Sequence, residues 1–154
     1  VYIRLFRRQA ENVFDDGYEF DLGKADLLRD GSDVTLIASG VCVANALQAA
    51  ETLAQEGVSA RVLNIHTIKP IDADAVIKAA SETGALVTAE NHNVIGGLGS
   101  AVAEVLAEQR PTPLERVGVK DHFGQVGKAP YLMGVFGITA ADIAKAARKA
   151  IARK

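Results

Sequence analysis

Cysteine, tryptophan and long apolar runs are scarce or missing in this sequence of 154 residues. Its single cysteine, Cys42, excludes an internal disulfide and indicates a reducing, cytoplasmic compartment. No apolar run approaches the roughly 20 residues that a membrane-spanning helix needs. The opening stretch, VYIRLFRRQ, lacks the apolar core of a signal peptide. These absences predict a protein that has no membrane partner.

An excess of charge of one sign is also missing. The 17 Lys and Arg residues nearly balance the 19 Asp and Glu residues, which leaves a net charge of −2. Nucleic-acid-binding domains usually carry a clear positive excess, so this class is not expected. The three histidines have no cysteine partner and no H-x-x-x-H spacing, so a structural zinc site is not expected either.

The chain begins with Val1, and its one methionine is Met133. We therefore expect a fragment or a processed product of a longer protein. Residues 1–5 form a strand-like run with no neighbouring run to pair with, which predicts the last strand of a preceding domain. On this interpretation 1–17 is the end of that domain and a linker, and 18–154 is a separate domain. The alternative is the loose terminus of a self-sufficient protein.

Strand-like and helix-like segments alternate along the rest of the chain. Apolar runs rich in β-forming residues predict strands at 25–28, 33–39, 60–65, 85–90 and 114–119, with a weaker signal at 18–22. Apolar residues at helical spacing predict helices at 43–57, 72–83, 101–109, 130–136 and 139–151. The alternation predicts a three-layer α/β fold, in which helices cover both faces of a five-stranded, mostly parallel sheet. Turn residues at 29–32 predict an antiparallel hairpin between the first two strands, and hence one antiparallel strand.

Two of the predicted helices carry clear end signals. Asp72 is the expected N-cap of the second helix, and Gly84 is expected to end it. Thr139 and Asp142 have the spacing of a capping box at the start of the last helix.

A glycine-rich turn joins the fourth predicted strand to the helix that follows it. Gly96, Gly97 and Gly99 allow a tight turn and close backbone approach. The run departs from the G-x-G-x-x-G dinucleotide fingerprint, because Val102 stands where the third glycine belongs. We favour close packing against another domain as the role of these glycines. The backbone amides at the helix start are also a candidate anion site.

Four polar residues, Glu90 to Asn93, lead into this turn. Glu90 and His92 are candidates for an acid–base pair, because histidine titrates near neutral pH. No nucleophile lies near them in the sequence, so we favour a hydrogen-bonded structural pair. Asn93, or Ser100 beyond the turn, is predicted to cap the following helix.

Two further features carry reactive or charged groups. Cys42 lies near a helix start, where the helix dipole lowers a thiol pKa, but its apolar neighbours favour a buried, inert thiol. Arg7 and Arg8 follow the strand-like run at 1–5, and arginine is a good bidentate ligand for phosphate or carboxylate. On these residues alone, a solvated surface role is favoured for both arginines.

Four phrases in this order resemble one family, the C-terminal domain of transketolase and its relatives: GSDVTLIASG, ARVLNIHTIKPID, LVTAENHNVIGGLGSAVAEVLAE and ERVGVKDHFGQVG. The relatives include 1-deoxyxylulose-5-phosphate synthase and the beta subunits of 2-oxoacid dehydrogenases. The resemblance covers residues 25–154, and VYIRLFRRQ is similar to the closing strand of the family's pyrimidine-binding middle domain. Within the family, the separately encoded C-terminal half of split transketolases is most similar.

The resemblance implies a five-stranded α/β domain with one antiparallel strand. It also implies that thiamine diphosphate and magnesium bind between two other domains of the parent enzyme, so that this chain binds no cofactor or metal itself. The chain is expected to dock on the N-terminal and middle domains or subunit and to contribute to a homodimer. In the family an arginine after the closing strand binds the sugar phosphate. Spacing places it at Arg7 and the R-Q match places it at Arg8, so both stay candidates.

The sequence therefore predicts the C-terminal domain of a thiamine-diphosphate-dependent transketolase, inactive alone, whose parent transfers a two-carbon ketol unit between sugar phosphates. Glu90, His92 and Gly97 match family positions for which no catalytic role carries over. One alternative is the corresponding domain of a deoxyxylulose-phosphate synthase or an oxoacid dehydrogenase beta subunit. The other is a stand-alone module that binds a nucleotide or anion at the glycine turn.

Overall fold

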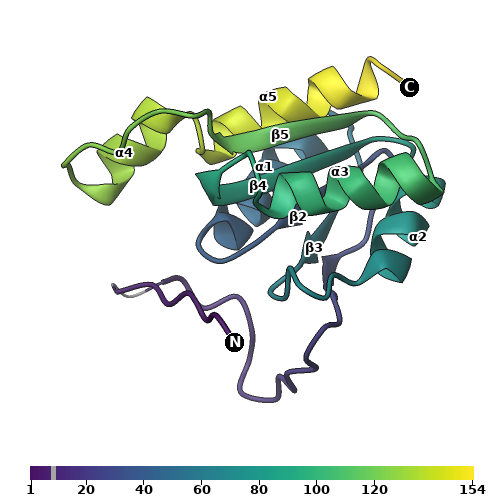
Figure 1. Ribbon diagram of the computed structural model, residues 1–154. Coiled ribbons are helices and arrows are strands. Elements are labelled where there is room, and N and C mark those ends of the chain that lie inside the picture. The colour runs from purple at the N-terminus through teal and green to yellow at the C-terminus, as the bar shows by residue number, and fades with distance from the viewer. Residues whose placement is uncertain (8–9) are drawn as a thin grey trace.

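The chain folds around a five-stranded mixed sheet, shown in Figure 1 by a computed structural model that describes residues 1–7 and 10–154. The strands are arranged in the order β1-β3-β2-β4-β5. Only the edge strand β1 is antiparallel, to its neighbour β3, and the other pairs are parallel. The sheet confirms the predicted fold class. The bounds are Asp26–Arg29 for β1, Val34–Ala38 for β2, Ala60–Asn64 for β3, Leu86–Asn93 for β4 and Leu114–Val119 for β5.

Two pairs of helices cover the two faces of the sheet. α1 and α5 pack together over one face, and α2 and α3 over the other, as the two separate apolar clusters show. The bounds are Cys42–Gln55 for α1, Ala73–Thr83 for α2, Leu98–Gln109 for α3, Ala129–Phe136 for α4 and Ala140–Ile151 for α5. Neighbouring residues of β2 serve opposite faces: Leu36 belongs to the first cluster and Ile37 to the second. No helix in the described part of the chain is both long and apolar enough to cross a membrane.

The end signals predicted for α2 and α5 are confirmed. The Asp72 carboxylate accepts the backbone N–H of Ala75 at 3.1 Å, and α2 ends at Gly84, which has a φ of 66°. Thr139 and Asp142 form the capping box of α5, each side chain accepting the backbone N–H of the other residue. Local chemistry alone determines these ends, because each cap satisfies backbone groups within its own turn.

The predicted hairpin between the first two strands is wrong. β1 pairs with β3, and β2 lies between β3 and β4. Every residue of β2 is buried, so this strand needs a neighbour on each edge and a helix layer on each face. The connection after β1 crosses the amino end of β3 at Gly31, where a Cβ would overlap the backbone of Ala60 and Arg61. Glycine at this position therefore allows β1 to reach the outer edge of the sheet.

The weaker predicted strand at 18–22 is wrong, because this segment is not in a strand, and residues 1–5 form no strand within this chain either. A strand needs a partner for its backbone groups, and side-chain contacts hold these segments instead. Tyr18 stacks on Phe14 with ring centroids 3.8 Å apart, and its hydroxyl donates to Asp26. The boundary between residues 17 and 18 and the assignment of 1–17 to a preceding domain stay predictions.

The crossing at Gly31 makes the position of β1 testable. Gly31→Ala is expected to lower the free energy of unfolding by about 1–3 kcal/mol, because the methyl group forces the connection away from β3. Urea unfolding of the chain measures the change. Gly124→Ala is the matched control, since a Cβ there meets nothing within 4 Å and its φ is ordinary. Equal stability of the two variants would contradict the crossing.

Candidate functional site

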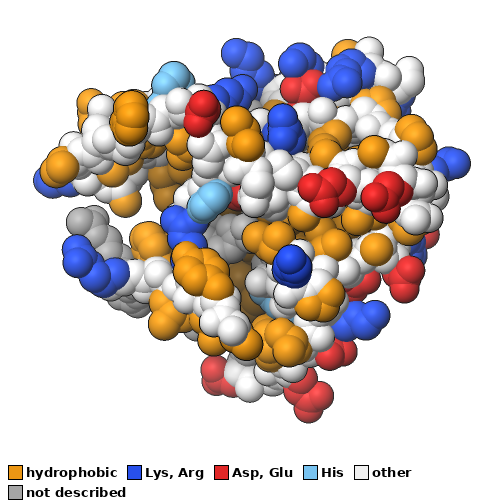
Figure 2. All heavy atoms as spheres, viewed as in Figure 1, with side chains coloured by type: hydrophobic (Ala, Val, Ile, Leu, Met, Phe, Trp, Pro, Cys, Tyr) orange, Lys and Arg blue, Asp and Glu red, His pale blue; other side chains and the backbone are white. Residues whose placement is uncertain are grey.

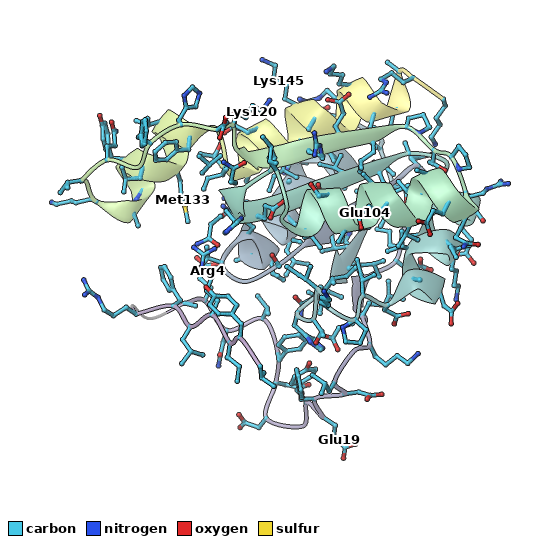
Figure 3. All side chains as sticks on the ribbon, in the orientation of Figure 1. Arg4, Glu19, Glu104, Lys120, Met133 and Lys145 are labelled. Carbon is cyan, nitrogen blue, oxygen red and sulfur yellow. The ribbon has the colours of Figure 1, made fainter. Side chains whose placement is uncertain are left out.

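The carboxyl ends of β2, β3 and β4 meet at one edge of the sheet, where open α/β folds place their ligands. A hollow of about 490 Å³ lies at this edge. Its walls come from the N-terminal segment, the start of α1, the end of β3 and the start of α4. Figure 3 shows Arg4 of the N-terminal segment reaching toward this edge, with Met133 of α4 on the other side of the opening.

A buried carboxylate holds the glycine turn in place. Glu90 is only 2% exposed, and its two carboxylate oxygens accept the backbone N–H groups of Leu98 and Gly99, both at 2.8 Å. These are the first N–H groups of α3, so a side chain from the preceding strand caps this helix. Gly97 is required beside it, because a Cβ at this position would overlap the Glu90 carboxylate.

The predicted caps of α3, Asn93 and Ser100, are wrong. α3 has Gly97 as its N-cap and no cap from a side chain of its own turn. The Asn93 side chain accepts the N–H of Ile95, and the Ser100 hydroxyl accepts the N–H of Gly96. Both side chains therefore stabilise the turn that precedes the helix.

The glycines of this turn make close contacts within the chain itself. A Cβ at Gly99 would lie 2.8 Å from the Arg116 side chain and 2.9 Å from the Thr88 hydroxyl, whereas Gly96 has open space and a φ of 76°. An external anion at the amides of Leu98 and Gly99 would have to displace Glu90. Contact of this turn with another domain or with an anion stays a prediction.

Glu90 and His92 do not meet, although they are two residues apart on one strand. The Glu90 carboxylate lies inside the turn, whereas His92 is exposed with its Nδ1 3.0 Å from the carbonyl oxygen of Asn93. The pairing of β4 with β5 is irregular between Ala89 and Asn93, which is where the side chains stop alternating regularly. Among the described residues neither an acid–base pair nor a hydrogen-bonded pair is formed by these two.

Cys42 is a buried, inert thiol, as predicted. It is fully buried at the start of α1. Burial raises the pKa of the Cys42 thiol to about 12, and the negative charge of Glu90 adds to this effect. The thiolate, which is the reactive form, is therefore strongly disfavoured.

A second polar cluster at this edge was missed by sequence reasoning. The Asp26 carboxylate accepts the Tyr18 hydroxyl at 3.1 Å and the Asn64 side-chain amide at 2.9 Å. His66 lies beside them, with its Nε2 4.0 Å from Asp26 and its ring centroid 4.4 Å from that of Phe20. These four side chains come from three separate segments, and no local spacing signals such a cluster.

His66 lines the hollow together with Asn64, and one of its ring nitrogens stays unused. Its Nδ1 lies 2.7 Å from the Thr67 hydroxyl, and its buried Nε2 has no hydrogen-bond partner among the described residues. With apolar neighbours such as Val43 and Met133, the hollow offers mainly van der Waals contact. The arrangement suits packing against another surface better than acid–base chemistry.

The two arginines predicted as candidate phosphate ligands stay untested as such. Arg7 is exposed, and Arg8 lies outside the described residues. Arg4, which the sequence did not single out, donates from its Nη2 to the backbone carbonyl of Asn91 at 3.0 Å. This hydrogen bond links the N-terminal segment to the carboxyl end of β4.

Known proteins resemble this chain over almost its whole length. The family model described as "Transketolase, C-terminal domain" matches residues 23–143. The "6-deoxy-6-sulfo-D-fructose transketolase subunit SqwH" of Clostridium sp. (strain MSTE9) is 57% identical over 100% of this chain and 48% of that protein. The "1-deoxy-D-xylulose-5-phosphate synthase 1" of Geobacter sulfurreducens is 41% identical over 88% of this chain and 22% of that protein.

A solved structure shows the same fold. The structure described as "Split gene transketolase, inactive beta4 tetramer" has a TM-score of 0.92 and 45% identity, and the match covers 95% of this chain and 48% of that one. The chain thus spans about half the length of these transketolase relatives.

The bonds of Glu90 can be tested directly. Glu90→Gln is expected to lower the free energy of unfolding by about 1–3 kcal/mol, because an amide side chain cannot accept both N–H groups and keeps no charge at the helix start. Hydrogen exchange at the amides of Leu98 and Gly99 is expected to accelerate. The control His92→Gln, on the exposed side of the same strand, is expected to stay within about 0.5 kcal/mol of the parent chain. Equal stability of the two variants would show that the carboxylate does not cap α3.

Proposed function

Since the chain belongs to the family of transketolase C-terminal domains, we propose that it forms the C-terminal part of a subunit of a thiamine-diphosphate-dependent transketolase. The observation that carries the proposal is its likeness to the split-gene transketolase structure, with a TM-score of 0.92 over 95% of the chain. In this role the chain supports domain docking and assembly, while the parent enzyme transfers a two-carbon ketol unit from a ketose to an aldose.

We place the cofactor between the other two domains of the parent enzyme, outside this chain. Thiamine diphosphate, when bound, supplies carbanion stabilisation. A diphosphate needs free backbone amides or cations and a magnesium ion needs oxygen ligands, but the amides at the start of α3 are bonded to Glu90. Within residues 1–7 and 10–154, no group of three or more His, Cys, Asp or Glu side chains is placed to hold a metal ion. The glycine turn therefore does not offer free amides to a diphosphate, which supports a docking role for this part of the chain.

The substrates are proposed to be sugars that end in an anionic group. SqwH is named for 6-deoxy-6-sulfo-D-fructose, and the family resemblance implies sugar phosphates. A sulfonate and a phosphate present similar tetrahedral oxygens, and a guanidinium group binds such oxygens in a bidentate manner. Arg7 or Arg8 is the proposed ligand from this chain.

Assembly with further polypeptide is part of the proposal. The solved relative is described as an inactive β4 tetramer. We expect the subunit that contains this chain to be inactive in the same way without a companion subunit, and to form a homo-oligomer of at least two copies. The 41% identity to a deoxyxylulose-phosphate synthase keeps that activity as the second candidate.

The activity itself decides between these candidates. The full-length subunit is mixed with its companion subunit, thiamine diphosphate, Mg²⁺ and glyceraldehyde 3-phosphate as acceptor, and ketol transfer is measured with 6-deoxy-6-sulfofructose and with fructose 6-phosphate as donors. A parallel reaction supplies pyruvate in place of the ketose, because deoxyxylulose phosphate forms from pyruvate and glyceraldehyde 3-phosphate with loss of CO₂. Transfer is expected from at least one donor, and only when both subunits are present. Formation of deoxyxylulose phosphate in place of ketol transfer, or transfer by this chain alone, would refute the proposal.

The arginine assignment has its own test in the same active complex. Arg7→Ala or Arg8→Ala is expected to raise the KM for the anionic donor by about 10- to 100-fold, because a charge-assisted contact contributes about 1.5–3 kcal/mol. The variant that shows the effect identifies the ligand, with kcat little changed. Lys24→Ala removes an exposed cation of the same segment and serves as the control. An unchanged KM in both arginine variants would remove this role from the chain.

A further inference from the structure

A bare apolar surface stands beside the candidate site, on residues 121–136, which we call the α4 arm. The arm consists of the loop 121–128 and α4, and none of the residues of α4 is fully buried. Four large apolar side chains are at least half exposed on it: Phe123, Val126, Tyr131 and Val135. Figure 1 shows α4 projecting from the body of the domain, and Figure 2 shows apolar side chains along this projection.

The arm is held in a defined position although its outer face is bare. Met133 and Phe136 pack against the apolar cluster of α1 and α5. The loop returns closely onto the helix, because a Cβ at Gly127 would lie 2.8 Å from the Tyr131 ring, and the Gln125 side chain lies 3.3 Å from the Tyr131 hydroxyl. An apolar surface that is both exposed and positioned is typical of an interface.

The root of this arm and the anchor of the N-terminal segment lie at the same edge of the sheet. Arg4 bonds to the carbonyl of Asn91 near the end of β4. Asn93, two residues further, pairs with Val119 of β5, and its side-chain amide lies 3.3 Å from the carboxylate of Asp121. Asp121 is the first residue of the arm. The Arg4 anchor of the N-terminal segment and the root of the arm therefore lie close to each other at this edge.

The N-terminal segment has the same unpartnered apolar character as the arm. Val1, Tyr2, Ile3 and Leu5 are all more than 70% exposed. The three residues before Arg4 span at most about 10 Å, so any polypeptide joined to Val1 leaves from the neighbourhood of Asn91. The transketolase relatives are about twice as long as this chain. On the proposed function, the preceding half of the subunit would join the chain near the α4 arm.

We propose that the bare face of the α4 arm docks on the polypeptide that precedes residue 1 in the full-length subunit. The inference rests on the proposed function, because it takes this chain as the C-terminal half of such a subunit. The docking buries Phe123, Val126, Tyr131 and Val135 against an apolar surface of the preceding half. The preceding polypeptide is favoured over a second copy because it is joined to the chain close to the arm, at the segment that Arg4 anchors to Asn91.

Thiol labelling of the full-length subunit tests the docking. Phe123→Cys and Val135→Cys place thiols on the arm, and Leu22→Cys places one on an apolar residue that is 73% exposed outside it. Maleimide labelling is followed peptide by peptide with mass spectrometry, so that other cysteines do not interfere. The arm thiols are expected to react roughly tenfold or more slowly than the control in the native subunit, and equally fast in urea. Equal native rates would overturn the proposal.

Photo-crosslinking identifies what covers the arm. A benzophenone side chain replaces Phe123 in the full-length subunit, in a mixture of isotopically light and heavy copies. Crosslinks to peptides upstream of residue 1 within the same copy are expected. Crosslinks to a second copy or to a companion subunit, or no crosslink to the upstream half, would overturn the assignment.

These readouts are independent of the activity assay. Free labelling of the arm in an active transketolase would remove the docking and leave the proposed function intact. A protected arm in a subunit pair with no ketol transfer would remove the proposed function and leave the docking intact.

Discussion

The carboxylate of Glu90 is the constraint on which the candidate site depends. It joins the end of β4 to the start of α3 by accepting the N–H groups of Leu98 and Gly99. Two of the four N–H groups that a helix start leaves unbonded are satisfied in this way, and the negative charge lies at the positive end of the helix dipole. The turn must then pass close to the carboxylate, which is why Gly97 has no room for a side chain. With these bonds in place, the carboxyl edge of the sheet presents a rigid turn, and Glu90 has no free oxygen facing a substrate.

Features that depend on nearby residues were predictable from the sequence. The ends of α2 and α5 followed from Asp72, Gly84 and the Thr139–Asp142 capping box, because each of these groups acts within a few residues. The three-layer fold followed from the alternation of strands and helices, since parallel strands need helical crossovers. Burial of Cys42 followed from its apolar neighbours. In each case the residues that decide the feature lie close together in the sequence, or the regular spacing of apolar residues decides it.

Features that depend on distant segments were not predictable in the same way. The turn residues after β1 favour a hairpin with β2. In the folded chain, however, the buried strand β2 has β3 on one edge and β4 on the other, so β1 pairs with β3. The only local trace of the crossing is Gly31, and a glycine there fits both alternatives. The same holds for the site: Tyr18, Asp26 and Asn64 meet only after three segments have folded. Glu90 was a candidate, but its partners lie across the turn, and the carboxylate could not be assigned to them from the spacing.

The distribution of polar and apolar groups at the carboxyl edge explains why this edge serves better as a platform than as a reaction centre. Three of its charged side chains are bonded to its own chain: Glu90 to the start of α3, Asp26 to Tyr18 and Asn64, and Arg4 to the end of β4. His66 keeps one ring nitrogen without a partner among the described residues, but it lies among apolar neighbours. A catalytic centre needs groups whose hydrogen-bonding capacity is free to follow the reacting atoms. What remains exposed beside this edge is mainly apolar, on the α4 arm and on residues 1–5. Burial of apolar surface lowers the free energy by about 25 cal/mol per Å², and this gain does not depend on the orientation of the partner. The edge thus holds its own backbone rigid and leaves apolar surface exposed beside it, an arrangement that favours packing over chemistry at this place.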